Sequence, residues 1–168
     1  MQPGDTLVRV AALGAVGLLV LMSAATLARG STTTAATVAV HKTPLGMVLA
    51  DANGHTLYLF AKDRNDRSAC SGACAGYWPP LLTTAKPRAG AGIKAALLGT
   101  TRRGDGHLQV TYKQHPLYLF ALDKAAGHAD GEGMSAFGGR WWVVSAKGTA
   151  VMKAAPSSTT TTSRYPYG

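Results

Sequence analysis

The two cysteines of the chain are the residues whose chemistry is easiest to name. Cys70 and Cys74 lie in the segment SACSGACAGYWPP, separated only by small residues. In an exported protein this spacing most simply indicates a local disulfide. Because the closed loop is short, the chain-entropy model gives such a disulfide a stabilisation of about 2 kcal/mol. The alternative is redox or metal chemistry, since a thiolate pair with an imidazole suits Cu(I).

Histidine and methionine are the side chains that could complete a soft-metal site. The chain has five histidines, and none of their spacings matches a common metal-binding motif. His55 and His115 each stand directly before one copy of a nearly duplicated segment, residues 56–63 and 116–123, and are expected to be turn residues. We therefore expect no resident metal or cofactor. The alternative, copper or haem handling, would use Cys70, Cys74, His55, His115, His128 and Met134.

Carboxylates and hydroxyls show no recognisable catalytic pattern. The sequence lacks G-x-S-x-G, H-E-x-x-H and P-loop motifs. The segment DRNDRS, which starts at Asp63, has arginine at its fifth position, and this breaks the calcium-binding EF-hand pattern. Asp63 and Asp123 are the only carboxylates that could be nominated as a pair, and the repeat geometry is expected to hold them apart. We expect a protein that is not an enzyme.

Both of these aspartates end an octapeptide that is nearly duplicated. TLYLFAKD covers residues 56–63, and PLYLFALD covers residues 116–123. In a strand, Tyr58 and Phe60 point to one face while Leu57 and Leu59 point to the other, so each copy should be a central strand covered on both sides. An aspartate just past a strand end can accept backbone N–H bonds and fix the turn that follows.

The elements that position these octapeptides are predicted to be β-hairpins. Residues 46–51 and 56–61 flank an Asn-Gly turn, and residues 108–113 meet the second octapeptide across Gln114-His115. Residues 97–102 and 141–146 add two strands, and helix is limited to a turn near 93–97. The predicted fold is all-β: a small antiparallel sandwich or barrel of two pseudo-symmetric hairpin repeats, preceded by an N-terminal hydrophobic helix.

The ends of the chain indicate export. Residues 10–28 carry no charge, so residues 1–30 are either a signal peptide or a membrane anchor, and the sequence leaves this open. A Ser/Thr/Ala linker (31–37), a β domain (38–153, with repeats at about 46–82 and 108–147) and a disordered tail (154–168) complete the expected organisation. No cysteine near the N-terminus could carry a lipid.

The charge of the chain restricts its partners. The formal net charge is +9, but pairs such as Arg102 and Arg103 are scattered and form no basic stripe with interleaved aromatics. This argues against nucleic acid as a partner. For an exported protein, anionic envelope polymers or lipid headgroups are more natural partners, as is a protein of the envelope.

Taken in order, these features resemble a known family. The two octapeptides, CSGACAGYWPPLL and GRWWVV resemble the bacterial secreted-repeat family of predicted lipoproteins with a Yx(FWY)xxD motif. The resemblance implies paired repeats in an exported protein of no settled activity, with motif members Tyr58, Phe60, Asp63, Tyr118, Phe120 and Asp123. We therefore expect an exported, non-enzymatic β-module that binds or organises an envelope component; the alternative is the redox or copper/haem-handling protein.

Overall fold

The computed structural model describes residues 34–152. The signal peptide or membrane anchor expected at residues 1–30, with its hydrophobic helix, lies outside the described residues, as does the tail at 154–168. Within residues 34–152, no helix is both long enough and apolar enough to cross a membrane.

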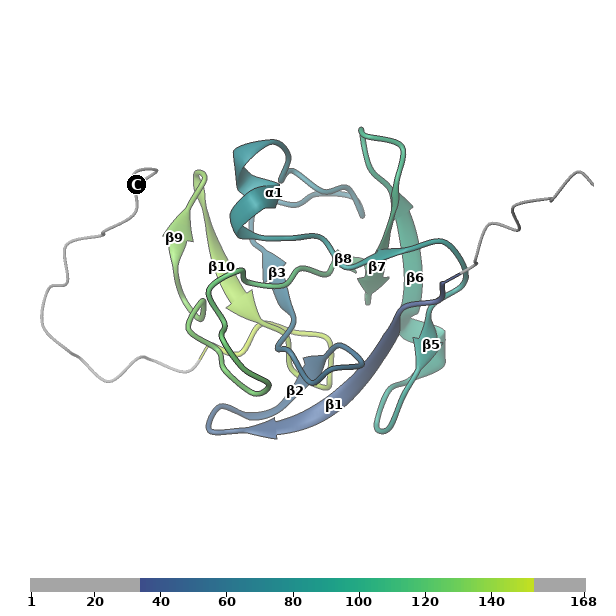
Figure 1. Ribbon diagram of the computed structural model, residues 1–168, viewed down its shortest axis with the longest axis vertical. Helices are drawn as coiled ribbons and strands as arrows, with labels where there is room; N and C mark the ends of the chain where they lie inside the picture. The colour runs from purple at the N-terminus through teal and green to yellow at the C-terminus, as the bar shows by residue number, and fades with distance from the viewer. Residues whose placement is uncertain (1–33, 153–168) are drawn as a thin grey trace, which may run out of the picture. The chain divides into compact units, whose positions relative to one another are not determined.

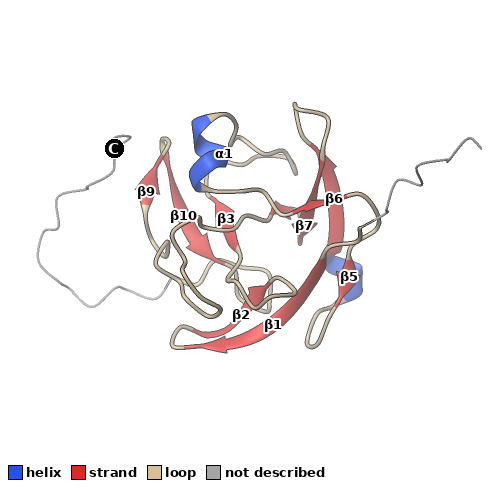
Figure 2. Cartoon of the chain, viewed as in Figure 1, coloured by secondary structure: helices blue, strands red, loops and turns tan. Residues whose placement is uncertain are grey.

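The described part of the chain is built almost entirely of short strands, and this confirms the predicted all-β class (Figure 2). Helix is confined there to the five-residue α1 and the single turn η1. In chain order the elements are β1 (Thr37–Thr43), β2 (Gly46–Ala50), β3 (Tyr58–Phe60), α1 (Ala73–Tyr77), β4 (Leu82–Thr83), β5 (Arg88–Ala89), η1 (Ala95–Leu97), β6 (Leu98–Arg102), β7 (Leu108–Tyr112), β8 (His115–Pro116), β9 (Ser135–Ala136) and β10 (Gly139–Val143).

The strands form three small sheets. Their orders are β2-β1-β5, β3-β10-β9 and β4-β7-β6, with β8 paired to β7. All of these pairs are antiparallel except β1 with β5. In Figure 1, β3 lies between β10 and β8, so the first octapeptide occupies a central place, as its apolar faces predict.

The two predicted hairpins differ in how much pairing they carry. The second is confirmed, but its two-residue turn is Lys113–Gln114, because His115 already pairs with Tyr112. In the first, the Asn53-Gly54 turn joins β2 to the octapeptide through one bridge between Ala50 and Thr56. The main partner of β2 is instead β1, which begins at Thr37 and for which the sequence analysis predicts no strand.

The two repeats are related by matching hydrogen bonds. The backbone N–H and C=O groups of Tyr58 and Tyr118 bond each other reciprocally, at 2.8 and 2.9 Å. Beside them, the hairpin of each repeat closes a triangle of three backbone bonds with the end of the other repeat. One triangle joins Leu57, Leu49 and Val144, and the other joins Leu117, Val110 and Leu81. The same positions of both repeats thus meet around the tyrosine pair, which is the predicted pseudo-symmetry.

Two buried clusters cover the octapeptide strands from opposite sides. The aromatic cluster contains Tyr58, Phe60, Tyr118 and Phe120. The aliphatic cluster contains the alternating leucines of the same strands, Leu57, Leu59 and Leu117. Period-2 alternation therefore sorts the side chains as the sequence predicts. The first octapeptide forms strand β3, whereas in the second only Pro116 lies in a strand, β8, and Tyr118 makes isolated bridges to Tyr58 and Pro80.

Candidate functional site

The tyrosine and the aspartate of each octapeptide find their partners in the other copy. The Tyr58 hydroxyl donates to Asp123 Oδ2 at 2.7 Å, and the Tyr118 hydroxyl donates to Asp63 Oδ2 at 2.9 Å. The two repeats therefore interlock through reciprocal Tyr–Asp pairs. This crossing explains why the motif occurs twice, because a single copy would leave its own tyrosine and aspartate without these partners.

Each aspartate also holds the loop that follows it. Asp63 Oδ1 accepts the backbone N–H of Ala69 at 2.7 Å, and Asp123 Oδ1 accepts that of Asp130 at 2.9 Å. These are the contacts expected of a carboxylate just past a strand end. No hydrogen bond joins the two carboxylates to each other within residues 34–152.

A stack of four aromatic rings lies beneath the interlocked pairs. Trp78 and Trp141 are parallel, with centroids 4.0 Å apart, and Phe120 and Phe60 extend the stack at 4.3 and 4.1 Å. Tyr58 and Tyr118 meet the two indoles edge-on, at 5.3 and 5.1 Å. Both arrangements are favoured geometries for aromatic pairs. The sequence analysis missed the stack, although a tryptophan follows the loop of each repeat at a similar place.

Burial shifts the pKa of the motif carboxyls upward. The pKa of Asp63 rises from 3.8 to about 6, although its bonds from Ala69 and Tyr118 and the nearby Arg103 favour the charged form. Burial likewise raises the pKa of Asp123. The pKa of each motif tyrosine is raised by burial and by the neighbouring carboxylate. Both hydroxyls therefore remain protonated donors at neutral pH.

The raised pKa of Asp63 predicts a pH dependence of stability. The folded chain holds this proton up to about pH 6, whereas the unfolded chain releases it near 3.8. Between these values the folded state binds more protons, so the free energy of unfolding should fall as pH rises through this window. Urea unfolding at pH 4 to 7 should show this slope in the wild type and a smaller one in Asp63→Asn. An equal slope in both proteins would contradict the assignment.

A buried arginine ties the Cys-containing loop to the second repeat. Arg103 is 7% exposed; it donates to Gln109 Oε1 at 2.7 Å, to Ser68 Oγ at 2.9 Å and to the Cys70 carbonyl at 2.8 Å. Ser68 in turn lies 2.8 Å from the Tyr118 hydroxyl. Arg103, which the sequence analysis counts only among the scattered positive charges, is therefore a buried residue of the core. Nothing in its sequence context distinguishes it from exposed Arg102.

The two cysteines form the predicted disulfide. Cys70 and Cys74 are 1% and 5% exposed and pack in the aromatic cluster. Cys74 lies in α1, and its carbonyl accepts the backbone N–H of Trp78 at 2.8 Å. The disulfide therefore fixes the short helix from which the polypeptide reaches the tryptophan stack.

Two histidines of the alternative metal site pair with nearby carboxylates. His55 pairs with Asp51 at 3.3 Å, and His128 lies 3.5 Å from Asp130. Met134 packs against the aromatic cluster, which also buries Cys70 and Cys74. In the part of the chain that the structure describes, no group of three or more His, Cys, Asp or Glu side chains is arranged to hold a metal ion.

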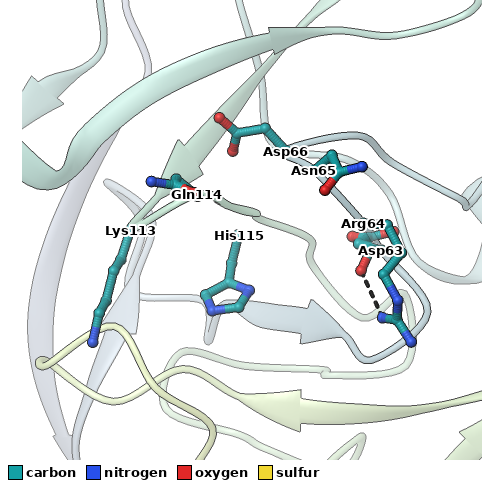
Figure 3. A pocket seen from close by; sticks show the side chains of 7 residues that line it. All are labelled: Asp63, Arg64, Asn65, Asp66, Lys113, Gln114 and His115. Atoms are coloured by element: carbon teal, nitrogen blue, oxygen red, sulfur yellow. Dashed lines mark hydrogen bonds between the residues drawn. The ribbon is translucent and has the colours of Figure 1, made fainter.

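His115 lines a polar cavity between two tight turns (Figure 3). The cavity has a volume of about 300 Å³. One wall is the turn that follows Asp63, and the other is the turn that precedes the second octapeptide. The lining residues are Asp63, Arg64, Asn65, Asp66, Lys113, Gln114 and His115. In Figure 3 the His115 ring lies between the Lys113 side chain and the Asp63–Arg64 segment.

A second cavity of about 350 Å³ adjoins the loop that Asp123 holds. It is lined by Pro44, Leu45 and residues 127–130. Both cavities thus open beside a loop whose position depends on a Tyr–Asp pair.

Comparison with known proteins gives one match. A family model described as a secreted repeat of unknown function matches residues 39–82 and 99–145, which together make up more than half of the chain. The two matched segments start within β1 and β6, so each takes in the hairpin and the octapeptide of one repeat. Searches of curated proteins and of solved structures found no match.

Proposed function

Because the chain belongs to this family of secreted repeat proteins, we propose that it is a non-enzymatic, exported module that binds a component of the bacterial cell envelope. The supporting observation is the placement of the two loops. The interlocked Tyr–Asp pairs fix both loops, and each loop lines a cavity. The duplicated motif would then be the scaffold, and the loops would contact the ligand.

The state of the motif carboxylates supports a scaffold role over an acid–base role. Both oxygens of Asp63 accept hydrogen bonds from the protein, and so do both oxygens of Asp123. A general base needs an oxygen within reach of a substrate proton. Here each oxygen already has a partner that positions the fold.

The charge of the chain favours an anionic component of the envelope, and we take an anionic polymer as the first candidate. A formal charge of +9 attracts polyanions by long-range electrostatics. Lipid headgroups and envelope proteins are the alternatives, and membrane attachment through an uncleaved N-terminal segment would add to any of them. Nucleic acid is not proposed as a partner.

The redox or copper/haem-handling alternative would use the cysteine pair. It requires reduction of a disulfide that is buried in the aromatic cluster before either thiolate could bind Cu(I). No contact described above favours this alternative specifically, so the binding module is the preferred proposal.

Releasing the loops is predicted to weaken binding although no charged side chain is replaced. In the double variant Tyr58→Phe/Tyr118→Phe, both aspartates lose their tyrosine donors, and the loops lose their fixed position. Cosedimentation of the full chain with insoluble envelope polymer should then show affinity reduced by about tenfold, equivalent to about 1.4 kcal/mol. Binding of the wild type itself should weaken at high salt.

Tyr112→Phe is the matched control for this experiment. Tyr112 is also buried, but its hydroxyl makes only 3.4 Å contacts to Lys94 and Ala146 and holds neither loop. Anionic lipid vesicles serve as the second ligand surface. Wild-type binding to neither surface would overturn the proposal, and equal loss in both variants would overturn the role of the loops.

A further inference from the structure

The two repeats differ at one equivalent place. Counted back from the octapeptides, Gly54 in the first hairpin corresponds to Gln114 in the second. At Gly54, the loop after Asp123 fills the adjacent space: the Gly127 N–H donates to the Gly54 carbonyl at 3.0 Å. A Cβ atom built on Gly54 would lie 3.0 Å from the Ala126 Cβ, so no room remains there. At Gln114 the corresponding space is the polar cavity.

The cavity is open because the loop after Asp63 folds back on itself. Arg64 and Arg67 exchange two backbone hydrogen bonds, and Asn65 and Asp66 form the turn with φ values of 51° and 64°. The Arg64 guanidinium donates to the carbonyls of Ala61 and Asp63, at 2.6 and 2.9 Å. No hydrogen bond joins residues 64–67 to residues 113–114, both of which the structure describes.

The residues that line the cavity combine carboxylates, which accept hydrogen bonds, with a lysine, which attracts an anion. Asp66 is a half-buried carboxylate on the cavity wall and can accept hydrogen bonds from a ligand there, whereas its Oδ1 atom is buried and has no partner within residues 34–152. Lys113 supplies an ammonium group, while the amides of Asn65 and Gln114 can both donate and accept. Burial and Lys113 lower the pKa of His115, so its ring offers one donor and one acceptor at neutral pH.

We infer that this cavity binds an acidic saccharide unit, whose ring hydroxyls donate to Asp66 and whose anionic group lies beside Lys113. The inference rests on the proposed function, because it names the ligand class of the same envelope-binding face. A volume of about 300 Å³ is at the lower end of ligand pockets, which suits one sugar ring of a polymer. A simple inorganic anion such as sulfate suits the cavity less well, because it has no hydroxyl group to donate to Asp66.

The probe for this inference is trigalacturonic acid, titrated into the full chain by calorimetry, with maltotriose as the neutral comparison. We expect heat from the acidic trisaccharide only. Asp66→Ala and Lys113→Gln should each weaken its affinity by about tenfold or more. Lys124→Gln is the matched control, because it removes the same charge from the loop after Asp123, and its affinity should stay within about twofold of the wild type.

Backbone NMR of the wild type provides a measurement that does not depend on the variants folding. Shifts induced by the trisaccharide should concentrate at residues 64–66 and 113–115. No titration, equal binding of maltotriose, or shifts concentrated elsewhere would overturn the inference. If the wild type still binds insoluble envelope polymer in that case, the proposed function stands with a different site. If the trisaccharide binds the cavity but the envelope polymer is not bound, the proposed function fails and the cavity remains a saccharide site.

Discussion

Replacing Trp141 by alanine is expected to lower the free energy of unfolding by about 3–5 kcal/mol, the usual cost of removing a large buried aromatic side chain. Trp141 is fully buried; it stacks on Trp78 on one side and on Phe60 on the other. Tyr118 also packs edge-on against its ring. The substitution would therefore open a cavity at the centre of the ring stack and remove support from the tyrosine that binds Asp63.

Trp142→Ala is the matched control, since it removes the same side chain one position along β10. Trp142 is only partly buried and packs against the aliphatic cluster, with the Arg140 guanidinium 5.6 Å from its ring centroid. We expect a loss well below that of Trp141→Ala, measured by urea unfolding followed through far-UV circular dichroism. Equal losses in the two variants would mean that the ring stack contributes nothing beyond ordinary burial.

The sequence predicted the parts of the fold that depend on local patterns. Alternation within LYLF predicted that Tyr58 and Leu57 would face opposite clusters, and the Asn-Gly dipeptide predicted a turn. The short spacing of Cys70 and Cys74 predicted their disulfide. The turn and the disulfide join residues that are close in the sequence, and the facing of side chains follows from the two-residue period of a strand. Each of these features can therefore be predicted from a single short segment.

Contacts between distant segments could not be predicted in this way. The pairing of Tyr58 with Asp123 spans 65 residues, and the octapeptide alone is equally compatible with a tyrosine and an aspartate that never meet. Strand β1 was missed because its main partner, β2, was assigned to a hairpin with the octapeptide. The candidate cavity also has no local signature, since it forms where two turns far apart in the sequence face each other.

The division between scaffold and loops follows from the same contacts. Hydrogen bonds, ring stacking and the leucine faces are alike in both repeats, whereas the segments after Asp63 and Asp123 differ in sequence and in path. A fold that repeats its framework and varies its loops can present a different surface in each copy without loss of core packing. The open space beside Gln114 and the filled space beside Gly54 are the clearest instance.

Arg103 holds the loop after Asp63 in place through its bonds to Ser68 and Cys70, so Arg103→Met should lower the stability of the protein. Methionine keeps much of the volume of the side chain but leaves Gln109 Oε1 and the Cys70 carbonyl without their donor. Hydrogen bonds from charged donors contribute about 1.5–3 kcal/mol each, and buried acceptors left unpaired cost more than is lost at a surface site. We therefore expect a loss of about 2–4 kcal/mol in the free energy of unfolding.

Arg102→Met separates this effect from the simple loss of a positive charge. Arg102 is exposed, and within residues 34–152 its side chain donates only to the Gly106 carbonyl, so its replacement should cost no more than about 0.5 kcal/mol. Hydrogen exchange should accelerate at residues 68–74 in Arg103→Met and stay unchanged in Arg102→Met.

The pKa of the Asp63 carboxyl gives a second measurement on the same hydrogen-bond network. Tyr118 donates to Asp63 and also lies beside Ser68, which accepts a hydrogen bond from Arg103. Arg103 lowers the pKa of this carboxyl, so Arg103→Met should move it further above its folded value of about 6, as read by NMR titration. A large loss of stability with no change in this pKa and no faster exchange near Cys70 would show that Arg103 acts only through packing. Coupled changes in all three would establish that one buried guanidinium joins the disulfide loop, the Tyr118–Asp63 pair and β7 into a single unit.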